Sequence, residues 1–237
     1  MIELSIVVPC YNEDENIYPL FDKIRDLLKK KEKIEVIVID NGSTDKTYKN
    51  ITNSNLYLNN KIKFLKIKKN LGYGYGIMKG VYMAKGNCIG WCHADLQTEP
   101  IDIYNAWKKN KNYLNNSKCI VKGIRKNRNF FDALFTFGMS VFASIIFSSR
   151  INDINAQPKL FHRSFLTHMK NYPYDFSLDL FFLVIAKQNL YKIINYNVFF
   201  KKRIYGEAKG GGSFKGKFKL IKRTFFYIIE LRKKLWK

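Results

Sequence analysis

The sequence contains little cysteine, and its cysteines are not arranged as a disulfide framework. Cys10, Cys88, Cys92 and Cys119 show neither paired short spacings nor the density of a disulfide-stapled protein. Cys88, Cys92 and the adjacent His93 raise the question of a zinc site. A spacing of four along a strand, however, places both thiols on one face and His93 on the other. We therefore expect a reduced, cytoplasmic protein with structural thiols.

Two common nucleotide-binding patterns and a secretion signal are also missing. No Walker A sequence occurs, and Gly72, Gly74 and Gly76 lack the spacing of the dinucleotide fingerprint and follow the third predicted strand instead of the first. This argues against a Rossmann oxidoreductase. Residues 1–9 have no basic leader and too short an apolar run for a signal peptide, so they are predicted to contain the first strand.

Acidic side chains are scarce relative to basic ones. The sequence has 42 Lys and Arg against 19 Asp and Glu, a formal net charge of +23. Such an excess favours an anionic partner, either nucleic acid, a membrane surface or a phosphorylated substrate, although compositional drift toward Lys explains part of it. No RNA-reading pattern, helix-turn-helix or zinc-finger spacing is found, so we expect no nucleic-acid partner. A basic nucleic-acid-binding protein is kept as the alternative from a different class.

The apolar periodicity predicts an α/β protein. Strands are expected at residues 4–8, 34–39, 62–67 and 88–92, helices at 14–33 and 77–84, and a flexible turn at Gly72–Gly76. This alternation predicts a mostly parallel central sheet with helices on both faces. Ligands of such sheets bind beyond the carboxyl ends of the strands, so residues 9–13, 40–45 and 93–97 are expected to converge.

The stretch Asn87–Gln97 ends an apolar strand with three polar side chains. In an extended chain the period of two would point His93, Asp95 and Gln97 the same way. An imidazole, a carboxylate and an amide oxygen can together hold a divalent ion, which in turn can hold a pyrophosphate. A polar strand end with one turn-forming Asp is the alternative that these residues leave open.

Several motifs, taken in order, resemble the family 2 inverting glycosyltransferases, whose fold is the nucleotide-sugar-binding GT-A fold. They are VVPCYNE at Val7–Glu13, VIDNGSTD at Val38–Asp45, NLG at Asn70–Gly72, and DLQ at Asp95–Gln97 before Pro100. In addition, KKRIYGEAK at Lys201–Lys209 is similar to the late signature of the dolichyl- or polyprenyl-phosphate sugar transferases, with one change. The resemblance implies a GT-A domain over residues 1–210, followed by a basic-aromatic tail at 211–237.

The resemblance also implies a site for a UDP- or GDP-sugar. Its nucleotide would be contacted by Pro9, Tyr11, Glu13, Asp40, Asn41, Gly72, Ala94 and Asp95. His93, Asp95 and Gln97 would hold Mg²⁺ or Mn²⁺ against the donor diphosphate. The family has Asp at the position of His93, and imidazole suits Mn²⁺ better than Mg²⁺, so the metal preference is open at this position.

Stabilising the departing nucleoside diphosphate is the main chemical demand on such an enzyme. The resemblance assigns catalytic roles to Asp95, Arg125, Arg203 and Asp153, and acceptor or phosphate binding to Arg125, Gln157, Arg203 and Lys209. A hydroxyl acceptor needs a carboxylate to take its proton, whereas an ionised polyprenyl phosphate attacks directly. Asp175 and Asp179 are further candidates for that carboxylate.

Two segments suggest contact with a membrane. Residues 130–147 carry only one charge. This segment of eighteen residues is shorter than the roughly 20 apolar residues that a membrane-spanning helix needs. They are predicted to form an interfacial helix within 130–148, with a buried core helix as the alternative. Residues 201–237 contain 13 basic and two acidic residues with interleaved aromatics, which suits anionic headgroups. Many members of the resembling family continue here into transmembrane helices, whereas this sequence ends. We therefore expect a cytoplasmic protein peripheral to the membrane.

These observations predict an inverting glycosyltransferase that moves a sugar from a nucleotide donor to a polyprenyl (dolichyl-like) phosphate carrier at the cytoplasmic membrane face. Transfer to a hydroxyl of a growing cell-surface glycan is the alternative within the class. His93 also raises the possibility of a degenerate, inactive transferase. The sequence predicts neither the sugar, nor the base, nor the oligomeric state.

Overall fold

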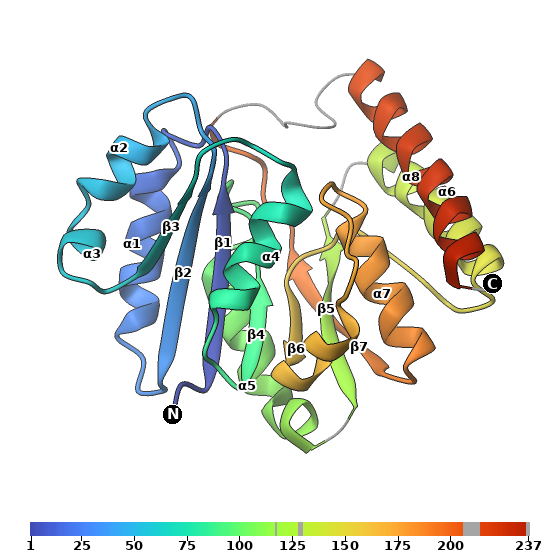
Figure 1. Ribbon diagram of the computed structural model, residues 1–237, viewed down its shortest axis with the longest axis horizontal. Helices are drawn as coiled ribbons and strands as arrows, with labels where there is room; N and C mark the ends of the chain where they lie inside the picture. The colour runs from blue at the N-terminus through green and yellow to red at the C-terminus, as the bar shows by residue number, and fades with distance from the viewer. Residues whose placement is uncertain (117, 128–129, 206–213, 236–237) are drawn as a thin grey trace.

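A seven-stranded sheet forms the centre of the computed structural model, which describes residues 1–116, 118–127, 130–205 and 214–235 (Figure 1). The strands are β1 (Leu4–Cys10), β2 (Ile34–Asn41), β3 (Lys63–Ile67), β4 (Cys88–Trp91), β5 (Cys119–Lys126), β6 (Lys159–His162) and β7 (Lys192–Phe199). Their order is β3-β2-β1-β4-β6-β5-β7. Only β6 runs antiparallel to its neighbours among the strands of the described residues. The prediction of a mostly parallel sheet in an α/β fold is confirmed.

Helices cover both faces of this sheet. One face carries α1 (Ile17–Leu28), α2 (Thr47–Thr52), α3 (Asn55–Leu58) and α5 (Pro100–Asn116), and the other carries α4 (Tyr73–Met83), α6 (Phe130–Ile146), α7 (Leu178–Gln188) and α8 (Phe214–Leu235). A short 3₁₀ helix spans Arg163–His168. Alternation along β1 explains the two layers, because Ile6 and Val8 pack toward α1 while Val7 packs toward α4.

Two sequence-based assignments differ from the structure. The turn predicted at Gly72–Gly76 is wrong, because α4 already begins at Tyr73. Its glycines are there for space: a Cβ on Gly74 would lie 2.3 Å from the Pro173 carbonyl oxygen, and one on Gly76 would lie 2.7 Å from the Asn41 side chain. The helix predicted at 14–33 is shorter, since residues 14–16 form a turn before α1.

The apolar segment predicted to lie at a membrane forms α6, and the basic segment near the end of the chain contains α8. These two helices pack against each other (Figure 1). Ala143 of α6 and Ile228 of α8 are buried in the same core cluster, and Phe142 stacks on Phe225 with ring centroids 4.6 Å apart. The outer side of α6 stays apolar and exposed at Leu134, Phe137, Val141 and Ile145. The helix is therefore neither wholly buried nor wholly detached. No helix in the described ranges is long and apolar enough to cross a membrane.

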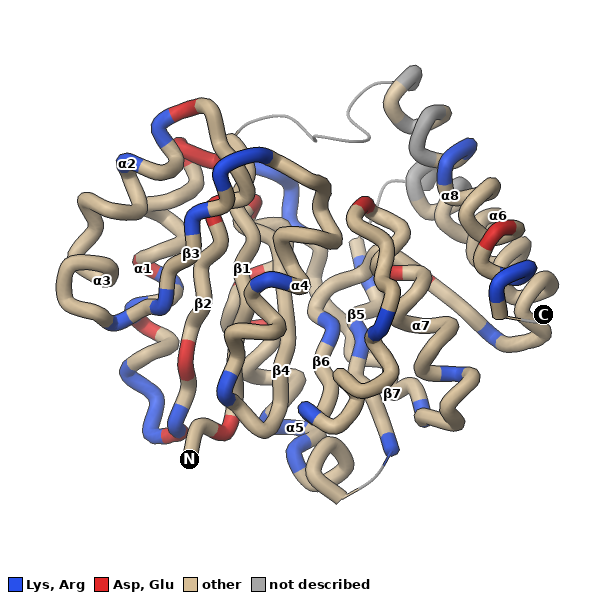
Figure 2. Tube along the Cα trace, viewed as in Figure 1, with Lys and Arg blue, Asp and Glu red and all other residues tan. Residues whose placement is uncertain are grey.

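Basic side chains do not form a single block. Lys and Arg lie along helices and loops on both sides of the sheet (Figure 2). The segment of α8 carries eight of them against one acidic residue, Glu230. The helix that continues the apolar surface of α6 is thus strongly basic as well.

The packing of α4 on the sheet can be tested with two mid-helix glycines. A Cβ at Gly80 would lie 2.4 Å from Val7 Cγ1, whereas a Cβ at Gly138 would have no described atom within 4 Å apart from its chain neighbours and the backbone of its own helix. We expect Gly80→Ala to lower the free energy of unfolding by about 1–3 kcal/mol through overpacking. Gly138→Ala should raise it by about 0.5–1 kcal/mol through helix propensity. Urea unfolding followed by circular dichroism measures both, and equal stabilisation by the two changes would contradict this packing.

Candidate active site

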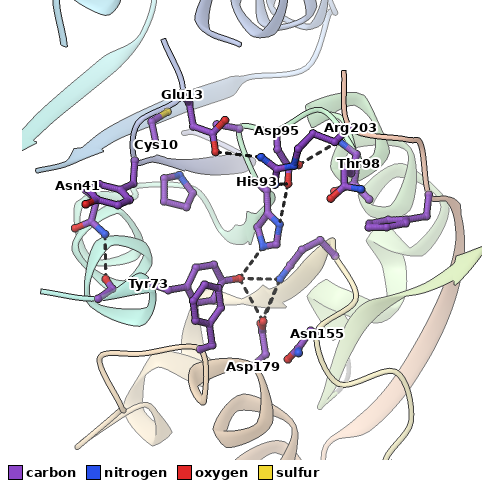
Figure 3. A pocket seen from close by; sticks show the side chains of 18 of the residues that line it. Cys10, Glu13, Asn41, Tyr73, His93, Asp95, Thr98, Asn155, Asp179 and Arg203 are labelled. Atoms are coloured by element: carbon purple, nitrogen blue, oxygen red, sulfur yellow. Dashed lines mark hydrogen bonds and ion pairs between the residues drawn. The ribbon is translucent and has the colours of Figure 1, made fainter. Parts of the chain in front are cut away.

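A cavity of about 410 Å³ lies at the carboxyl ends of β1, β2 and β4 (Figure 3). It is lined by Pro9, Cys10, Tyr11, Glu13, Asn41, Asn70, Gly72, Tyr73, His93, Ala94, Asp95, Gln97, Thr98, Arg125, Asn155, Gln157, Phe176, Asp179, Phe200 and Arg203. The lining includes residues from all three loops that the sequence predicts to converge. The parallel sheet produces this convergence, because the loops after its strands leave from the same edge.

Hydrogen bonds tie the loop after β1 to the loop after β2. The Asn12 amide donates to Ser43 Oγ at 3.0 Å, the Thr44 amide donates to Asn12 Oδ1 at 2.9 Å, and the Glu13 amide donates to Thr47 Oγ1 at 2.8 Å. Asn12 adopts a left-handed conformation with φ of 51°, which Asn tolerates better than most residues. The wall that carries Tyr11 and Glu13 is therefore held in place by residues 43–47.

Asp40 behaves differently from the other predicted nucleotide contacts. Pro9, Tyr11, Glu13, Asn41, Gly72, Ala94 and Asp95 all line the cavity, but Asp40 does not. Its side chain is fully buried, and Oδ1 accepts a hydrogen bond of 2.9 Å from the Ser43 amide. In this structure Asp40 shapes the turn that presents Asn41.

His93, Asp95 and Gln97 line the cavity, but they do not lie along one extended strand. That prediction is wrong, because β4 ends at Trp91 and Leu96 has a left-handed φ of 58°. Asp95 Oδ1 accepts from the Gln97 amide at 3.1 Å, which makes a tight turn. His93 Nδ1 lies 3.9 Å from Asp95 Oδ2. The side-chain nitrogen Nε2 of Gln97 instead donates to the Lys201 carbonyl oxygen at 3.2 Å.

Arg203 places a positive charge on these carboxylates. Its Nη2 lies 2.5 Å from Asp95 Oδ2, and its Nη1 lies 3.7 Å from Glu13 Oε1. Arg203 follows β7 and reaches the loops of β1 and β4, two neighbours in the centre of the sheet. The residue predicted to bind phosphate thus lies directly beside the predicted cation site. Lys209, predicted with it, lies outside the described residues.

Arg125 lines the cavity, but its predicted partner in catalysis does not. Asp153 accepts from the Arg125 backbone amide at 2.8 Å and from Nε at 2.9 Å, and it also forms an ion pair with Nη2. Burial works to raise the pKa of Asp153, and the neighbouring guanidinium outweighs it and lowers that pKa. Asp153 is therefore an ionised partner that orients Arg125. This position does not favour the proton-accepting role predicted from the sequence.

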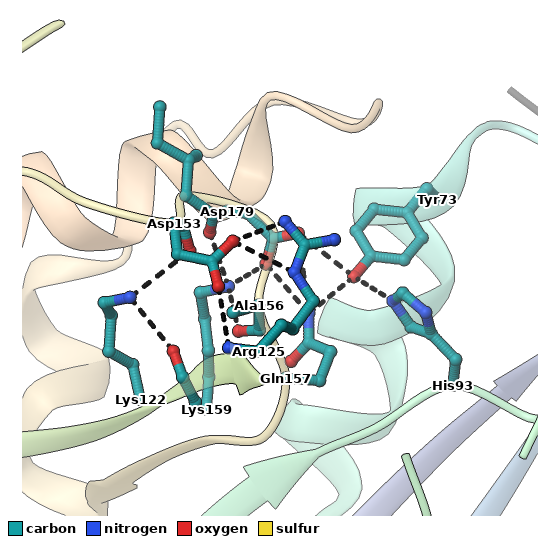
Figure 4. A network of polar contacts seen from close by, with 11 residues as sticks. Tyr73, His93, Lys122, Arg125, Asp153, Ala156, Gln157, Lys159 and Asp179 are labelled. Carbon is teal, nitrogen blue, oxygen red and sulfur yellow. Dashed lines mark hydrogen bonds and ion pairs between the residues drawn. The ribbon is translucent and has the colours of Figure 1, made fainter. Parts of the chain in front are cut away.

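A buried polar network behind the cavity joins β6, α7, α4 and the residues that follow β4 (Figure 4). Lys159 of β6 donates to Asp179 of α7 at 2.7 Å, and both side chains are almost completely buried. Gln157 Nε2 donates to Asp179 and to Tyr73 Oη, and Tyr73 Oη lies 2.9 Å from His93 Nε2. Burial lowers the pKa of His93 and, together with Asp179, raises that of Tyr73. The cavity therefore holds a neutral imidazole and a protonated phenol at pH 7.

The sequence reasoning missed Tyr73 and the two buried lysines of this region. Tyr73 was hidden by the turn predicted at residues 72–76. The signal for these lysines is their place in buried strands, because Lys122 follows the apolar CIV of CIVKGIRK and Lys159 begins KLFH. Asp179 was named among the alternatives, and the structure places it in the cavity. Asp175 lies on the loop before α7, where it pairs with Arg223 of α8 at 3.2 Å.

Residues 5–132, more than half of the chain, match the family model described as glycosyl transferase family 2. The chain belongs to glycosyltransferase family 2. The family consists of enzymes that transfer sugars, which is the class that the sequence motifs predict.

Curated relatives of this glycosyltransferase share about a quarter to a third of their aligned residues. The dolichyl-phosphate beta-glucosyltransferase of Homo sapiens is 30% identical over 179 residues, which cover 68% of this chain and 55% of that protein. The dodecaprenyl-phosphate galacturonate synthase of Rhizobium johnstonii is 25% identical over 178 residues, covering 71% and 50%. The chain therefore spans about half the length of these relatives.

Solved structures confirm the GT-A fold. A glucosyl-3-phosphoglycerate synthase of Mycobacterium tuberculosis, in complex with Mn²⁺, UDP and glucosyl-3-phosphoglycerate, superposes with a TM-score of 0.72 at 15% identity, covering 98% of this chain and 80% of that one. A mannosyltransferase of Pyrobaculum calidifontis, in complex with GDP-Man and Mn²⁺, gives 0.62 at 19% identity, covering 89% and 58%. At these identities the likeness concerns the fold alone.

The residues of the site fit a divalent cation that is completed by a substrate. Within the part of the chain that the structure describes, no group of three His, Cys, Asp or Glu side chains could hold a metal by itself. Two donor atoms each about 2.1 Å from one ion can lie up to about 4.2 Å apart, so His93 Nδ1 and Asp95 Oδ2 at 3.9 Å can share an ion. Donor phosphates commonly supply the remaining ligands of such sites.

The buried Lys122 makes stability depend on pH. Burial, helped by the positive charge of Lys159, lowers the pKa of Lys122 to about 7. Above pH 7 the folded protein has released this proton while the unfolded chain still holds it, so stability rises with pH. We expect the free energy of unfolding of the wild type, relative to Lys122→Met, to rise between pH 7 and 9 by up to about 1.4 kcal/mol per pH unit. Denaturant unfolding at several pH values measures this difference, and parallel profiles would contradict it.

Proposed function

We propose that this glycosyltransferase moves a sugar from a nucleotide-diphosphate sugar to a polyprenyl phosphate at a membrane face. One observation carries the choice of acceptor. Each of the three carboxylates that line the cavity is already engaged: Glu13 with Asn16 and Arg203, Asp95 with Arg203 and the Gln97 amide, and Asp179 with Lys159 and Gln157. A hydroxyl acceptor needs a carboxylate to take its proton, whereas an ionised phosphate does not.

The activities for which the relatives are named support the same acceptor class. The human and Rhizobium proteins are named for transfer involving dolichyl phosphate and dodecaprenyl phosphate, and both are polyprenyl carriers joined to a phosphate. The structural neighbours were solved with UDP or GDP-Man. A UDP- or GDP-sugar donor and a lipid-phosphate acceptor are therefore the substrates we assign to this chain.

The reaction that these residues would serve is an inverting displacement. An oxygen of the acceptor phosphate bonds to the anomeric carbon as the bond from that carbon to the donor diphosphate breaks, and a nucleoside diphosphate leaves. Arg203 and Arg125 lie on the cavity wall, where their guanidinium donors suit phosphate oxygens. His93 and Asp95 would hold a divalent ion, which supplies additional positive charge for the leaving diphosphate. Tyr11 and Asn41 lie at the β1 and β2 end, where we place the nucleoside.

A lipid acceptor requires the cavity to meet a membrane, and α8 offers a connection. Arg223 of α8 lies over the ring of Phe176 at 5.2 Å and pairs with Asp175. Phe176 lines the cavity and stacks on Tyr73 with ring centroids 4.6 Å apart. Helices α6 and α8 also carry exposed apolar side chains, at Leu134, Phe137, Val141, Ile145, Phe218, Phe225 and Phe226. Apolar and basic groups together suit an anionic lipid surface.

The acceptor class is tested by comparing undecaprenyl phosphate with undecaprenol, which differs by the phosphate alone. The purified chain is supplied with Mn²⁺ and each of UDP-glucose, UDP-galacturonate and GDP-mannose. We expect one donor to give a glycolipid with the phosphate and none with the alcohol, because the carboxylates of the described residues that line the cavity are already paired. Equal transfer to the alcohol would contradict the proposal, and so would the absence of turnover with all three donors.

Arg203 should matter in the same assay. Arg203→Ala removes a guanidinium from the phosphate end of the cavity, so we expect transfer to fall by about 10²–10³-fold. Arg25→Ala is the matched control, because Arg25 forms only an exposed ion pair with Asp22 on α1. Comparable losses in both variants would show that Arg203 has no special place in the reaction.

Membrane contact is tested by sedimentation with lipid vesicles. Phe137→Glu and Phe226→Glu put a negative charge on exposed apolar positions of α6 and α8, and each should weaken binding to phosphatidylglycerol vesicles by about tenfold or more, because a buried Phe contributes about 1.5–3 kcal/mol. Leu58→Glu alters an equally exposed position on α3, at the far end of the molecule (Figure 1), and should leave binding unchanged. Wild-type binding by both Phe variants would exclude this surface.

A further inference from the structure

Tyr73 connects the candidate metal ligand His93 to the buried ion pair behind the cavity. It is the first residue of α4, and its ring is clamped by Phe176 at an interplanar angle of 12°. Three polar atoms of the described residues lie within hydrogen-bond distance of its hydroxyl oxygen: His93 Nε2 at 2.9 Å, Gln157 Nε2 at 3.0 Å and Asp179 Oδ2 at 3.3 Å (Figure 4). A hydroxyl has one proton to donate, so these contacts constrain one another.

The constraint starts at Lys159. Its ammonium donates to the carbonyl oxygens of Ile154 and Ala156 at 2.9 and 3.1 Å, and its third contact is Asp179 Oδ1 at 2.7 Å. All three ammonium protons therefore have acceptors. The partner Asp179 is an ionised carboxylate, which can only accept hydrogen bonds.

Gln157 must turn its amide nitrogen toward Asp179, since the reverse orientation would place two acceptors face to face. The same nitrogen donates to Tyr73 Oη. Tyr73 could give its proton to Asp179 Oδ2 or to an unprotonated His93 Nε2, and we assign it to Asp179 because a carboxylate in an ion pair is the stronger acceptor. With its own proton used and Gln157 donating, the Tyr73 oxygen has a lone pair for one more donor, which is His93 Nε2–H.

The tautomer of His93 follows from this order of donors. With the proton on Nε2, the nitrogen Nδ1 carries a lone pair, and it lies 3.9 Å from Asp95 Oδ2. The opposite tautomer would aim an Nδ1–H at Asp95 over a distance too long for a hydrogen bond and would take the Tyr73 proton away from Asp179. We propose that Tyr73 is a positioning residue that fixes His93 as an Nδ1 ligand for a divalent cation shared with Asp95.

This assignment rests on the proposed nucleotide-sugar site and adds a metal preference to it. Metal-binding histidines commonly donate their other ring N–H to an oxygen that holds the ring and its tautomer. Here that oxygen belongs to a phenol that is itself held by Gln157, Asp179 and Phe176. A neutral imidazole with one carboxylate favours Mn²⁺, Co²⁺ or Zn²⁺ over Mg²⁺. Tyr73 thereby supports the exchange of carboxylate for imidazole at position 93.

Binding measurements separate this role from catalysis. Mn²⁺ affinity is measured by electron paramagnetic resonance in the presence of saturating UDP or GDP, whichever the wild type binds, and the affinity for that nucleotide in EDTA is measured by calorimetry. Tyr73→Phe should weaken Mn²⁺ binding by about 10–100-fold, the usual effect of removing a residue that orients a metal ligand, and should leave nucleotide binding in EDTA unchanged. Tyr75→Phe is the matched control, because Tyr75 lies on the same helix but does not line the cavity.

The effect must also pass through His93. In a His93→Asp background, where no tautomer has to be fixed, adding Tyr73→Phe should change Mn²⁺ affinity by less than about threefold, and Mg²⁺ should gain relative to Mn²⁺. An equal loss in both backgrounds, or wild-type affinity in Tyr73→Phe, would overturn the proposal. Absence of binding of both UDP and GDP to the wild type, with any divalent ion, would instead overturn the proposed function.

The tautomer itself is read by nitrogen-15 NMR of the metal-free wild type, assigned with His93→Ala. We expect the His93 proton on Nε2 in the wild type. A proton on Nδ1 would overturn the proposal even if the metal affinities agreed with it.

Discussion

The ion pair between Lys159 and Asp179 is the contact on which the centre of this protein depends. It joins β6, the one antiparallel strand of the described sheet, to α7 on the face that carries α4. Two charges buried this completely are stable only when each also finds hydrogen-bond partners, and removing one partner of such a pair costs about 3–5 kcal/mol. Here backbone carbonyls satisfy Lys159, and Gln157 and Tyr73 satisfy Asp179. Core stability and the orientation of a site residue therefore depend on the same charges.

Electrostatics in the cavity follow a similar rule, because its charges neutralise one another. Arg203 bridges toward Asp95 and Glu13, and Arg125 is held by Asp153. An anionic donor that enters this space meets guanidinium groups already oriented by carboxylates, so it has to share or replace those contacts. A divalent ion at Asp95 would compete with Arg203 for the same carboxylate oxygen, so that Arg203 would become available to the phosphates. Under the proposed function, the pairing would thus link cation binding to phosphate binding.

The outer helices are connected to this chemistry through one loop. Residues 172–177 lie between α8 and the cavity, with Asp175 and Phe176 touching Arg223 on one side and Phe176 stacking on Tyr73 on the other. The loop also packs on α4, where a Cβ at Gly72 would lie 2.3 Å from the Tyr174 carbonyl. A displacement of α8 would therefore be felt at Tyr73 through packed rings, without any long-range mechanism.

The sequence by itself determined the fold class, the edge of the sheet that carries the site and most of the lining residues. Apolar strands alternating with helices leave few arrangements, and loops after parallel strands must meet at one edge. Only the tertiary structure decided which side chains face one another. Asp40 and Asp153 do not line the cavity, since a backbone amide binds Asp40 and the Arg125 guanidinium binds Asp153. A left-handed residue at Leu96 ends the extended conformation that would align Gln97 with His93. Local sequence did not indicate the contacts of Tyr73, Lys122 and Lys159. Their partners are 20 to more than 100 residues away or are backbone carbonyls. Local periodicity records which face of an element is buried, but it carries no information about which distant donor meets which acceptor.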